Sequence, residues 1–226
     1  RIWVVSDASR GFASGALARA ALHVARDPDS DDGWFNISRL AVDATDALSL
    51  SRAEMEGRQQ AWRAAKFLQA EVPGCEAGRL RAFGTQVGVR ETRRVQGEHV
   101  LSAEDLLTPV QFADAIAAGA YPIDIHPSAG GGLDYRGLGD DHAYQIPYRS
   151  LIPVGFDNAL AVGRGVSASH QALAAIRVMT ISMAVGQAAG VAAALACKTE
   201  SAVADVRSVK LEALQRLLRA QGAVLA

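Results

Sequence analysis

The chain has 226 residues, of which 50% are hydrophobic and 21% are charged, and its formal net charge is −1. This length and composition allow a buried core and one or two domains. A net charge near zero provides no basic field for nucleic acid or an anionic membrane, so we expect neither as a partner. The two cysteines, Cys75 and Cys197, form no disulfide framework or zinc pattern. With no signal peptide at its start, the chain is predicted to be cytoplasmic.

The first 72 residues predict strands, a helix and turns. Residues 1–7 and 34–37 have strand composition, whereas residues 12–25 are consistent with either a helix or a strand. Ser51 followed three residues later by an acid has the spacing of a capping box, which predicts a helix over residues 51–72.

Two large side chains of that helix are expected to face the core. Met55 and Trp62 share one face with other apolar residues at helical spacing.

The middle of the chain predicts short elements that alternate. We expect strands over residues 79–90 and 121–125, short helices over 102–107 and 109–118, and a loop over 128–142. The loop is rich in Gly and Asp and has a length that is usual for binding segments.

The C-terminal part holds the most informative pattern. Residues 144–152 predict an edge strand, and residues 159–162 are a short apolar run that predicts a buried strand before a tight turn. A helix is expected from Leu173 to Cys197, and an amphipathic helix over residues 206–221. Free amides and the helix dipole point toward such a turn, so the residues alone predict a cofactor or phosphate cradle at 163–178.

The same region resembles the C-terminal part of FAD-dependent oxidoreductases with a glutathione-reductase-type flavin fold. The resemblance covers roughly residues 40–200. Its motifs are residues 88–94, 121–126, 146–151, 157–158, 163–164, 169–170, 177–179 and 186–190. It implies an α/β fold of mixed helix and strand, the C-terminal half of an FAD/NAD(P)-binding flavoprotein fold with part of its substrate-domain β-sheet. Two positions depart from the family pattern, Gly165 where members often have Cys and Thr180 where they often have Pro.

The resemblance also implies domains, a cofactor and a missing part. We expect a substrate-domain portion over residues 1–143, a segment of the FAD-binding domain over 144–200 and a closing helix over 201–226. FAD is the implied cofactor. Members hold its pyrophosphate with an N-terminal G-x-G-x-x-G strand–turn–helix, and this sequence has no such motif. We therefore expect a complementary N-terminal polypeptide that carries this motif.

The resemblance assigns candidate site residues, for which ordinary structural roles remain open. The candidate catalytic residues are His170 and His126 as general bases and Arg90 as a guanidinium facing substrate or FAD. The candidate cofactor-binding residues are Gly163, Arg164, Ser169, His170, Arg177, Val178, Gly186 and Gln187. Each histidine could instead be a structural hydrogen-bonding residue. Arg90 and its neighbours Arg93 and Arg94 could instead form salt bridges with Glu91.

Residues 178–197 carry no formal charge and have nearly the length of a membrane span. Their many Ala and Gly residues favour a helix buried against a sheet instead. The resemblance implies a reaction in which a hydride passes from a C–H bond of a small alcohol or amine-like substrate to flavin N5. The alternative is a non-catalytic scaffold subunit of a flavoprotein complex.

Overall fold

A computed structural model describes residues 2–5, 8–18, 22–125, 134–139, 142–198 and 204–225 of the chain. It divides into two compact units. Unit 1 comprises residues 1–89 with 127–132, and unit 2 comprises residues 90–126 with 133–226. The division after residue 89 differs from the predicted boundary after residue 143, which separates functional segments and stays a prediction.

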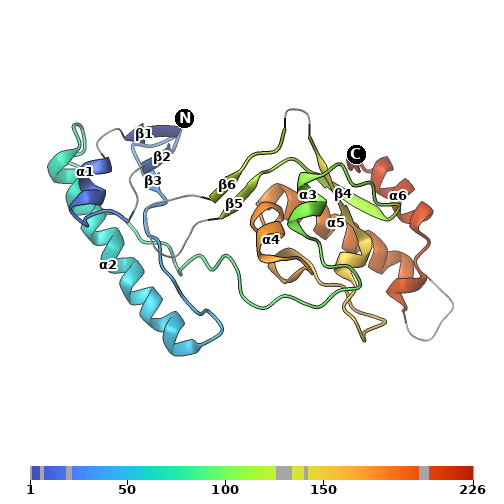
Figure 1. The fold of residues 1–226 in the computed structure, drawn as a ribbon. Helices are drawn as coiled ribbons and strands as arrows, with labels where there is room; N and C mark the ends of the chain where they lie inside the picture. Colours follow the sequence, from blue (N-terminus) through green and yellow to red (C-terminus); the bar gives the residue numbers. More distant parts are fainter. Residues whose placement is uncertain are drawn as a thin grey trace. The chain divides into compact units, whose positions relative to one another are not determined.

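Unit 1 combines a small antiparallel sheet with a long helix (Figure 1). The sheet has the order β1 (Ile2–Val5), β2 (Leu22–Arg26), β3 (Gly33–Phe35). The helices are α1 (Ala8–Ala13) and α2 (Ala47–Glu71). The ambiguous residues 12–25 therefore contain the end of a helix and the beginning of a strand.

Helix α2 begins four residues earlier than the predicted start at Ser51. Asp46 is its N-cap and accepts a hydrogen bond from the Ser49 amide at 2.7 Å. The Ser51 hydroxyl instead donates to the carbonyl of Ala47 one turn back, so the predicted capping box is wrong. Asp46 has the same capping chemistry as Ser51, but the sequence analysis did not consider it.

The core of unit 1 is small, and it excludes both large side chains that were predicted to face it. Its buried members are Leu17, Ile37, Ala64, Phe67 and Leu68. Met55 and Trp62 are exposed, and Lys66 lies over the Trp62 ring instead.

Unit 2 contains the larger core, which is built from two strand pairs and four α-helices. The strands are β4 (Ala115–Gly119) paired with β7 (Tyr144–Pro147), and β5 (Ile123–Ile125) paired with β6 (Asp134–Arg136), all antiparallel. The helices are α3 (Ala103–Leu107), α4 (His170–Ile176), α5 (Met179–Ala196) and α6 (Leu211–Ala220). The predicted α/β fold class is confirmed.

Four predicted elements are wrong or only half right, three in unit 2 and residues 79–90, which lie almost entirely in unit 1. Residues 109–118 contain the strand β4 instead of a helix, because Ala115–Gly119 pairs with the buried strand β7. Residues 79–90 form no strand, and neither do residues 159–162. The amide of Ala161 donates to the carbonyl of Leu151 at 2.8 Å, but no strand of the described residues runs beside this segment. Residues 144–152 form a strand only as far as Pro147 and continue as a 3-10 helix.

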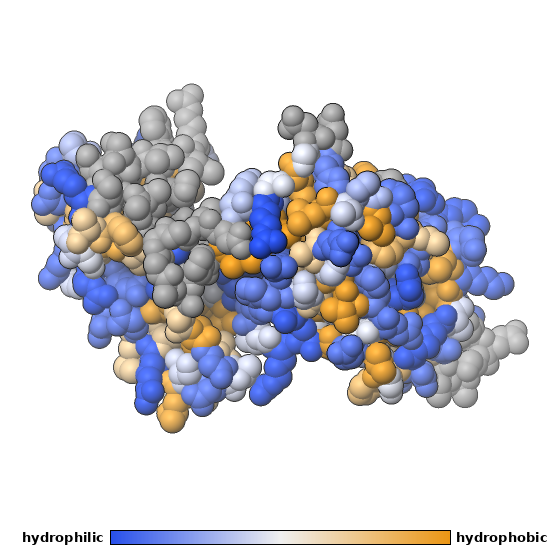
Figure 2. Space-filling view, in the orientation of Figure 1, coloured by the Kyte–Doolittle hydropathy of each residue, from blue (hydrophilic) through white to orange (hydrophobic). Residues whose placement is uncertain are grey.

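Helix α5 is buried along one face. It packs against β4 and α6, with Ile181, Val185, Ala188 and Ala192 in the core. By length and hydropathy alone it is the one helix of the described residues that could cross a membrane. Hydrophobic side chains reach the surface of both units in places (Figure 2). The expectation that no membrane is involved stays a prediction.

The residues that follow β7 hold two other segments in place. The amide of Glu98 donates to the carbonyl of Ile152 at 3.0 Å, and the amide of Val154 donates to the carbonyl of Gln96 at 2.8 Å. On the other side, the amide of Ser167 donates to the carbonyl of Ser150 at 3.2 Å. The backbone approaches closely at Gly97, where a Cβ would lie 2.6 Å from the Cβ of Ser167. These contacts fix the turn that precedes α4.

The carboxylate of Asp114 anchors this arrangement at the start of β4. It accepts hydrogen bonds from the amide, Nε and Nη2 of Arg149, at 3.1, 3.0 and 3.2 Å. Its side chain is only 5% exposed. Burial would raise the pKa of Asp114, but the hydrogen bonds from Arg149 outweigh it and hold the pKa below its ordinary value.

We expect Asp114→Asn to destabilise unit 2 by about 1.5–3 kcal/mol at pH 7, because it removes the charge from a buried set of hydrogen bonds. A lowered folded-state pKa stabilises the protein above the unfolded-state value of 3.8, and this stabilisation is lost as the pH falls through the folded-state value. The difference between wild type and variant should therefore shrink below pH 3.8. Denaturant unfolding from pH 7 to pH 2.5 measures it, with Asp157→Asn as an exposed control. A difference that stays constant at all pH values contradicts this account.

Candidate functional site

The predicted cradle begins with a tight turn beside α5. Residues Gly163–Gly165 form a single 3-10 turn that packs against this helix. Gly163 has a φ of 64°, a left-handed conformation that strongly favours glycine. Arg164 is exposed on the turn. Ser169 caps α4 by accepting a hydrogen bond from the Ala172 amide at 3.1 Å, so its hydroxyl already has a structural role.

The chain breaks between α4 and α5, where one continuous helix was predicted. The amide of Arg177 donates to the carbonyl of Leu173 at 3.1 Å and closes α4. Val178 then adopts an extended conformation, with φ −67° and ψ 148°, and α5 begins after it. The Arg177 amide is therefore engaged, and the amides that could meet a cofactor begin at Val178.

The first turn of α5 is open. No side chain of the described residues caps it, and it contains no acidic residue. Met179 at its tip is 81% exposed. Uncapped amides and the positive end of an 18-residue helix favour a negative charge at this place.

His170, the first residue of α4, is paired with an acid. Its Nδ1 lies 2.6 Å from Oε2 of Glu91, and the other oxygen of Glu91 accepts a hydrogen bond from Arg94. An ionised carboxylate can only accept, so Nδ1 carries the proton and Nε2 is left as the base. Of the three clustered arginines, Arg94 forms the salt bridge with Glu91 that was considered as an alternative to a role in the site. Among the described residues Arg90 and Arg93 have none.

Arg177 lies in a second polar group on the other side of α4, against β5. Its Nη2 donates to the carbonyl of Asp124 at 3.2 Å, and the Tyr121 hydroxyl donates to Oδ2 of Asp124 at 3.3 Å. Burial lowers the pKa of Arg177, and the charge of Arg90 lowers it further. Burial and the charge of Asp124 raise the pKa of Tyr121. The Arg177 guanidinium is therefore bonded to the backbone of β5.

Two predicted cofactor-binding residues lie away from the open helix end. Gly186 and Gln187 are eight and nine residues beyond Val178, which is about 12 Å or more along the helix axis. Gln187 donates to the side chain of Gln221 at 2.9 Å. A Cβ at Gly186 would meet open space. The candidate base His126 lies outside the described residues.

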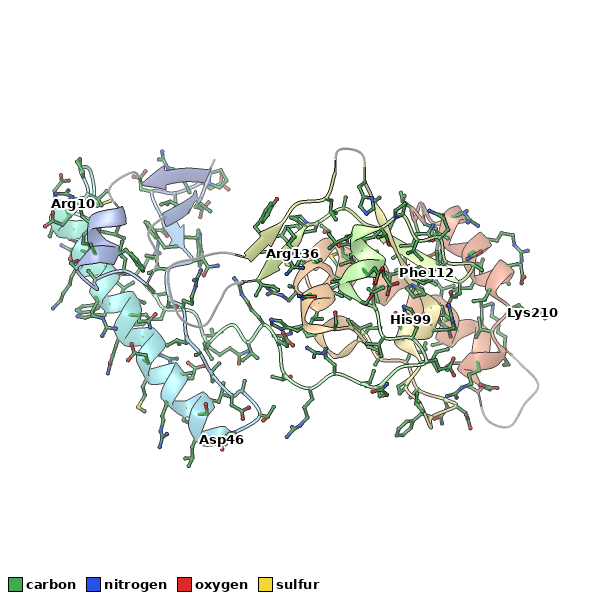
Figure 3. The ribbon with its side chains drawn as sticks, in the orientation of Figure 1. Arg10, Asp46, His99, Phe112, Arg136 and Lys210 are labelled. Atoms are coloured by element: carbon green, nitrogen blue, oxygen red, sulfur yellow. The ribbon has the colours of Figure 1, made fainter. Side chains whose placement is uncertain are left out.

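Sequence reasoning missed the partners of these groups. Glu91 was considered as a salt-bridge partner for arginine, and Tyr121 and Asp124 as part of a strand; all three lie in motifs of the family resemblance, but no site role was assigned to them. His99 was also not singled out. It lies beside the ring of Phe112 and 3.2 Å from the carboxylate of Asp105 (Figure 3). The pairing of Glu91 with His170 joins residues 79 apart in sequence, and no local pattern signals it.

A pocket of about 360 Å³ lies elsewhere in unit 2. Its polar lining includes Glu98, Asp114, Arg149 and Arg207. None of the predicted site residues lines it. Arg207 is fully engaged there with Glu98, Asp157 and backbone carbonyls. Among the described residues no cluster of His, Cys, Asp and Glu could hold a metal ion.

Cofactor-binding enzymes of the α/β class often use an open helix start and a histidine–carboxylate pair, and this chain has both features. The chain matches the model of the family described as FAD dependent oxidoreductase over residues 8–218. It therefore belongs to the FAD-dependent oxidoreductase family, and FAD is its cofactor. Comparisons with curated proteins and with solved structures found no match.

The described residues fit the flavin-ring end of FAD. The first turn of α5 offers amide donors that no side chain caps. A Cβ added at Gly163 or at Gly165 would meet open space. Val178 and the amides after it would hold the anionic edge of the cofactor.

We expect Thr180→Asp to change stability and flavin affinity in opposite directions. An acid in the first turn of α5 should stabilise the protein by about 0.3–1 kcal/mol at low salt, because it complements the helix dipole. The same charge should weaken FAD binding by repelling the partly negative N1–C2=O edge of the flavin. Chemical denaturation and flavin fluorescence titration measure the two effects, with Thr180→Asn as the uncharged control. Unchanged or tighter FAD binding would show that the cofactor does not use this helix end.

Proposed function

We propose that this protein transfers a hydride from a C–H bond of an alcohol or amine-like substrate to flavin N5, with His170 as the general base. The observation that supports this best is the 2.6 Å contact between His170 Nδ1 and Glu91 Oε2. A histidine whose Nδ1 proton is held by a carboxylate presents an unprotonated Nε2, as a base requires.

Bound FAD supplies the hydride acceptor, and the residues of the chain supply position and proton transfer. Nε2 of His170 takes the proton from the substrate hydroxyl or amine. Glu91 holds the ring in the required tautomer and stabilises its protonated form. Arg94 holds Glu91 in turn, so the carboxylate does not rotate away.

We expect His170→Ala to lower kcat by about 10²–10⁴-fold, the usual contribution of a general base. Glu91→Gln should lower it about tenfold, because the neutral amide stabilises the protonated ring less. His142→Ala is the matched control, since His142 bonds the carbonyl of Leu106 in the same unit.

Stopped-flow flavin reduction over a pH series measures these effects. A His170→Ala variant that reduces flavin at the wild-type rate rejects the proposed base. If His170→Ala loses activity but Glu91→Gln keeps the wild-type rate, the role of Glu91 is rejected and that of His170 is kept.

We infer further that the pyrophosphate of FAD is held by a complementary polypeptide with a G-x-G-x-x-G strand–turn–helix. The support is that these 226 residues contain no such motif, while the open end of α5 is suited to the flavin ring only. In this proposal the chain is the C-terminal portion of a flavin fold of the glutathione-reductase type. The complex acts on a small molecule in the cytoplasm.

Native mass spectrometry of the purified protein tests the complementary polypeptide. We expect a mass that contains FAD together with a second polypeptide or additional residues. A lone 23.7 kDa species that holds FAD tightly rejects the proposal.

A second candidate function is that of a non-catalytic scaffold subunit. The exposed apolar side chains Met179 and Met183 on α5 favour it, because they offer a face to another protein. Native mass spectrometry together with the absorbance spectrum of the same sample separates the two functions. An intact complex that shows no flavin absorbance supports the scaffold.

A further inference from the structure

Two stretches of unit 2 decide how close Glu91 lies to His170. The first, residues 91–101, begins with the acid and is called the carboxylate segment here. The second, residues 165–169, ends where α4 begins at His170 and is called the α4 turn. These two stretches carry both members of the pair, so the distance of 2.6 Å between Nδ1 and Oε2 depends on how the stretches pack.

Backbone hydrogen bonds join the two stretches on either side of their middle. The amide of Val95 donates to the carbonyl of Gly165 at 3.0 Å. The amide of Leu101 donates to the carbonyl of Ser167 at 3.1 Å, and its own carbonyl accepts from the amide of Ser169 at 2.8 Å. The carboxylate segment therefore lies against the α4 turn as closely as the residues between these bonds allow.

Gly97 lies at the closest approach between the two stretches. A Cβ at this position would lie 2.6 Å from the Cβ and 3.0 Å from the Oγ of Ser167, and 3.2 Å from the carbonyl oxygen of Ser150. Carbon atoms that are not bonded to each other lie about 3.5–4.0 Å apart. A side chain at residue 97 would thus force the two stretches apart by about 1 Å.

The α4 turn is the less movable of the two stretches. Its residues 166–168 are buried, and the amide of Ser167 donates to the carbonyl of Ser150 at 3.2 Å. The carboxylate segment lies at the surface, with Thr92, Arg93 and Gln96 exposed. A larger residue 97 should therefore displace this segment together with the carboxylate that it carries.

Such a displacement is large enough to break the pair. The contact between His170 and Glu91 is 2.6 Å, and a further separation of about 1 Å would take it beyond hydrogen-bond distance. The tautomer of a histidine is set by the hydrogen bond that one of its ring nitrogens makes. Without the acid, nothing would hold the proton on Nδ1, and Nε2 would not be kept free as a base.

We propose that Gly97 is a positioning residue for the proposed base. Its missing side chain lets the carboxylate segment approach the α4 turn closely enough for Glu91 to hold His170 in the required tautomer. Gly97 acts only through Glu91 and contacts neither substrate nor flavin. The inference rests on the proposed function for the catalytic role of His170, whereas the packing that it describes does not depend on that role.

Ser167 provides a way to reverse the effect of a side chain at residue 97. Its hydroxyl is buried and has no hydrogen-bond partner in the part of the chain that the structure describes. Ser167→Gly therefore removes both atoms nearest to the added Cβ without removing a hydrogen bond. The remaining neighbour, the carbonyl oxygen of Ser150 at 3.2 Å, requires a shift of only a few tenths of an ångström. The double variant Gly97→Ala with Ser167→Gly should thus restore the close approach.

The first experiment determines the tautomer of His170 without flavin chemistry. The protein is prepared with isotope-labelled histidine, and both imidazole nitrogens are observed by long-range proton–nitrogen NMR at alkaline pH, with His170→Ala to assign the signals. We expect the wild type to carry the proton on Nδ1 and Gly97→Ala to exchange it between both nitrogens. The double variant with Ser167→Gly should return to the wild-type spectrum.

Gly88→Ala is the matched control for this experiment. Gly88 lies three residues before Glu91, and a Cβ there would meet open space, so the spectrum should not change. A Gly97→Ala spectrum identical to that of the wild type overturns the inference. Loss of the folded state in Gly97→Ala also overturns it, because Gly97 would then be required for the fold and not for the pair. A double variant that keeps the mixed tautomer shows that the clash with Ser167 is not the cause, and this too overturns the inference.

The second experiment separates this inference from the proposed function. The holo protein is mixed with a series of alcohols and amines, and flavin reduction is recorded. We expect Gly97→Ala to lower kcat about tenfold with KM within about twofold of wild type, because the pair acts on the chemical step and not on substrate binding. A changed tautomer with an unchanged rate rejects His170 as the base and keeps the positioning role of Gly97. If no compound reduces the wild-type flavin, the proposed function is rejected and the tautomer alone decides the inference.

Discussion

The pairing of Asp114 with Arg149 fixes the part of unit 2 on which the candidate site depends. The carboxylate joins the start of β4 to the end of β7 through three hydrogen bonds. It thereby sets the position of the buried residues 150–152, whose carbonyls accept from three other segments. One of these leads directly through Ser167 to the N-cap of α4. A buried carboxylate satisfied in this way is a rigid anchor, because breaking its bonds to Arg149 would leave a buried charge without a partner.

The charges around α4 are distributed unequally as a result. At its first residue, His170, Glu91 and Arg94 form a complete set in which every charge has a partner. At its end, Arg177 donates to the backbone carbonyl of Asp124, and among the described residues no carboxylate forms an ion pair with it.

The sequence predicted elements well where the signal was local. The hydroxyl of Ser102 caps α3 as expected, with Asp105 completing the capping box. The family resemblance also placed the flavin end of the site on α5, and the chain does belong to that family. The predictions failed where pairing with distant residues decided the outcome. Ala115–Gly119 has the composition of a helix but is a strand, because β7 pairs with it.

The break between α4 and α5 shows why the site itself was only partly predictable. Residues 173–197 have helical composition throughout, and neither Gly nor Pro marks Val178 as an interruption. The break nevertheless produces the open amides and turns the Arg177 side chain toward Asp124. A continuous helix would have used those amides internally and would offer no donors for a cofactor. The property that makes this region suitable for flavin therefore comes from one extended residue, and tertiary packing around α4 selects that conformation against the local preference.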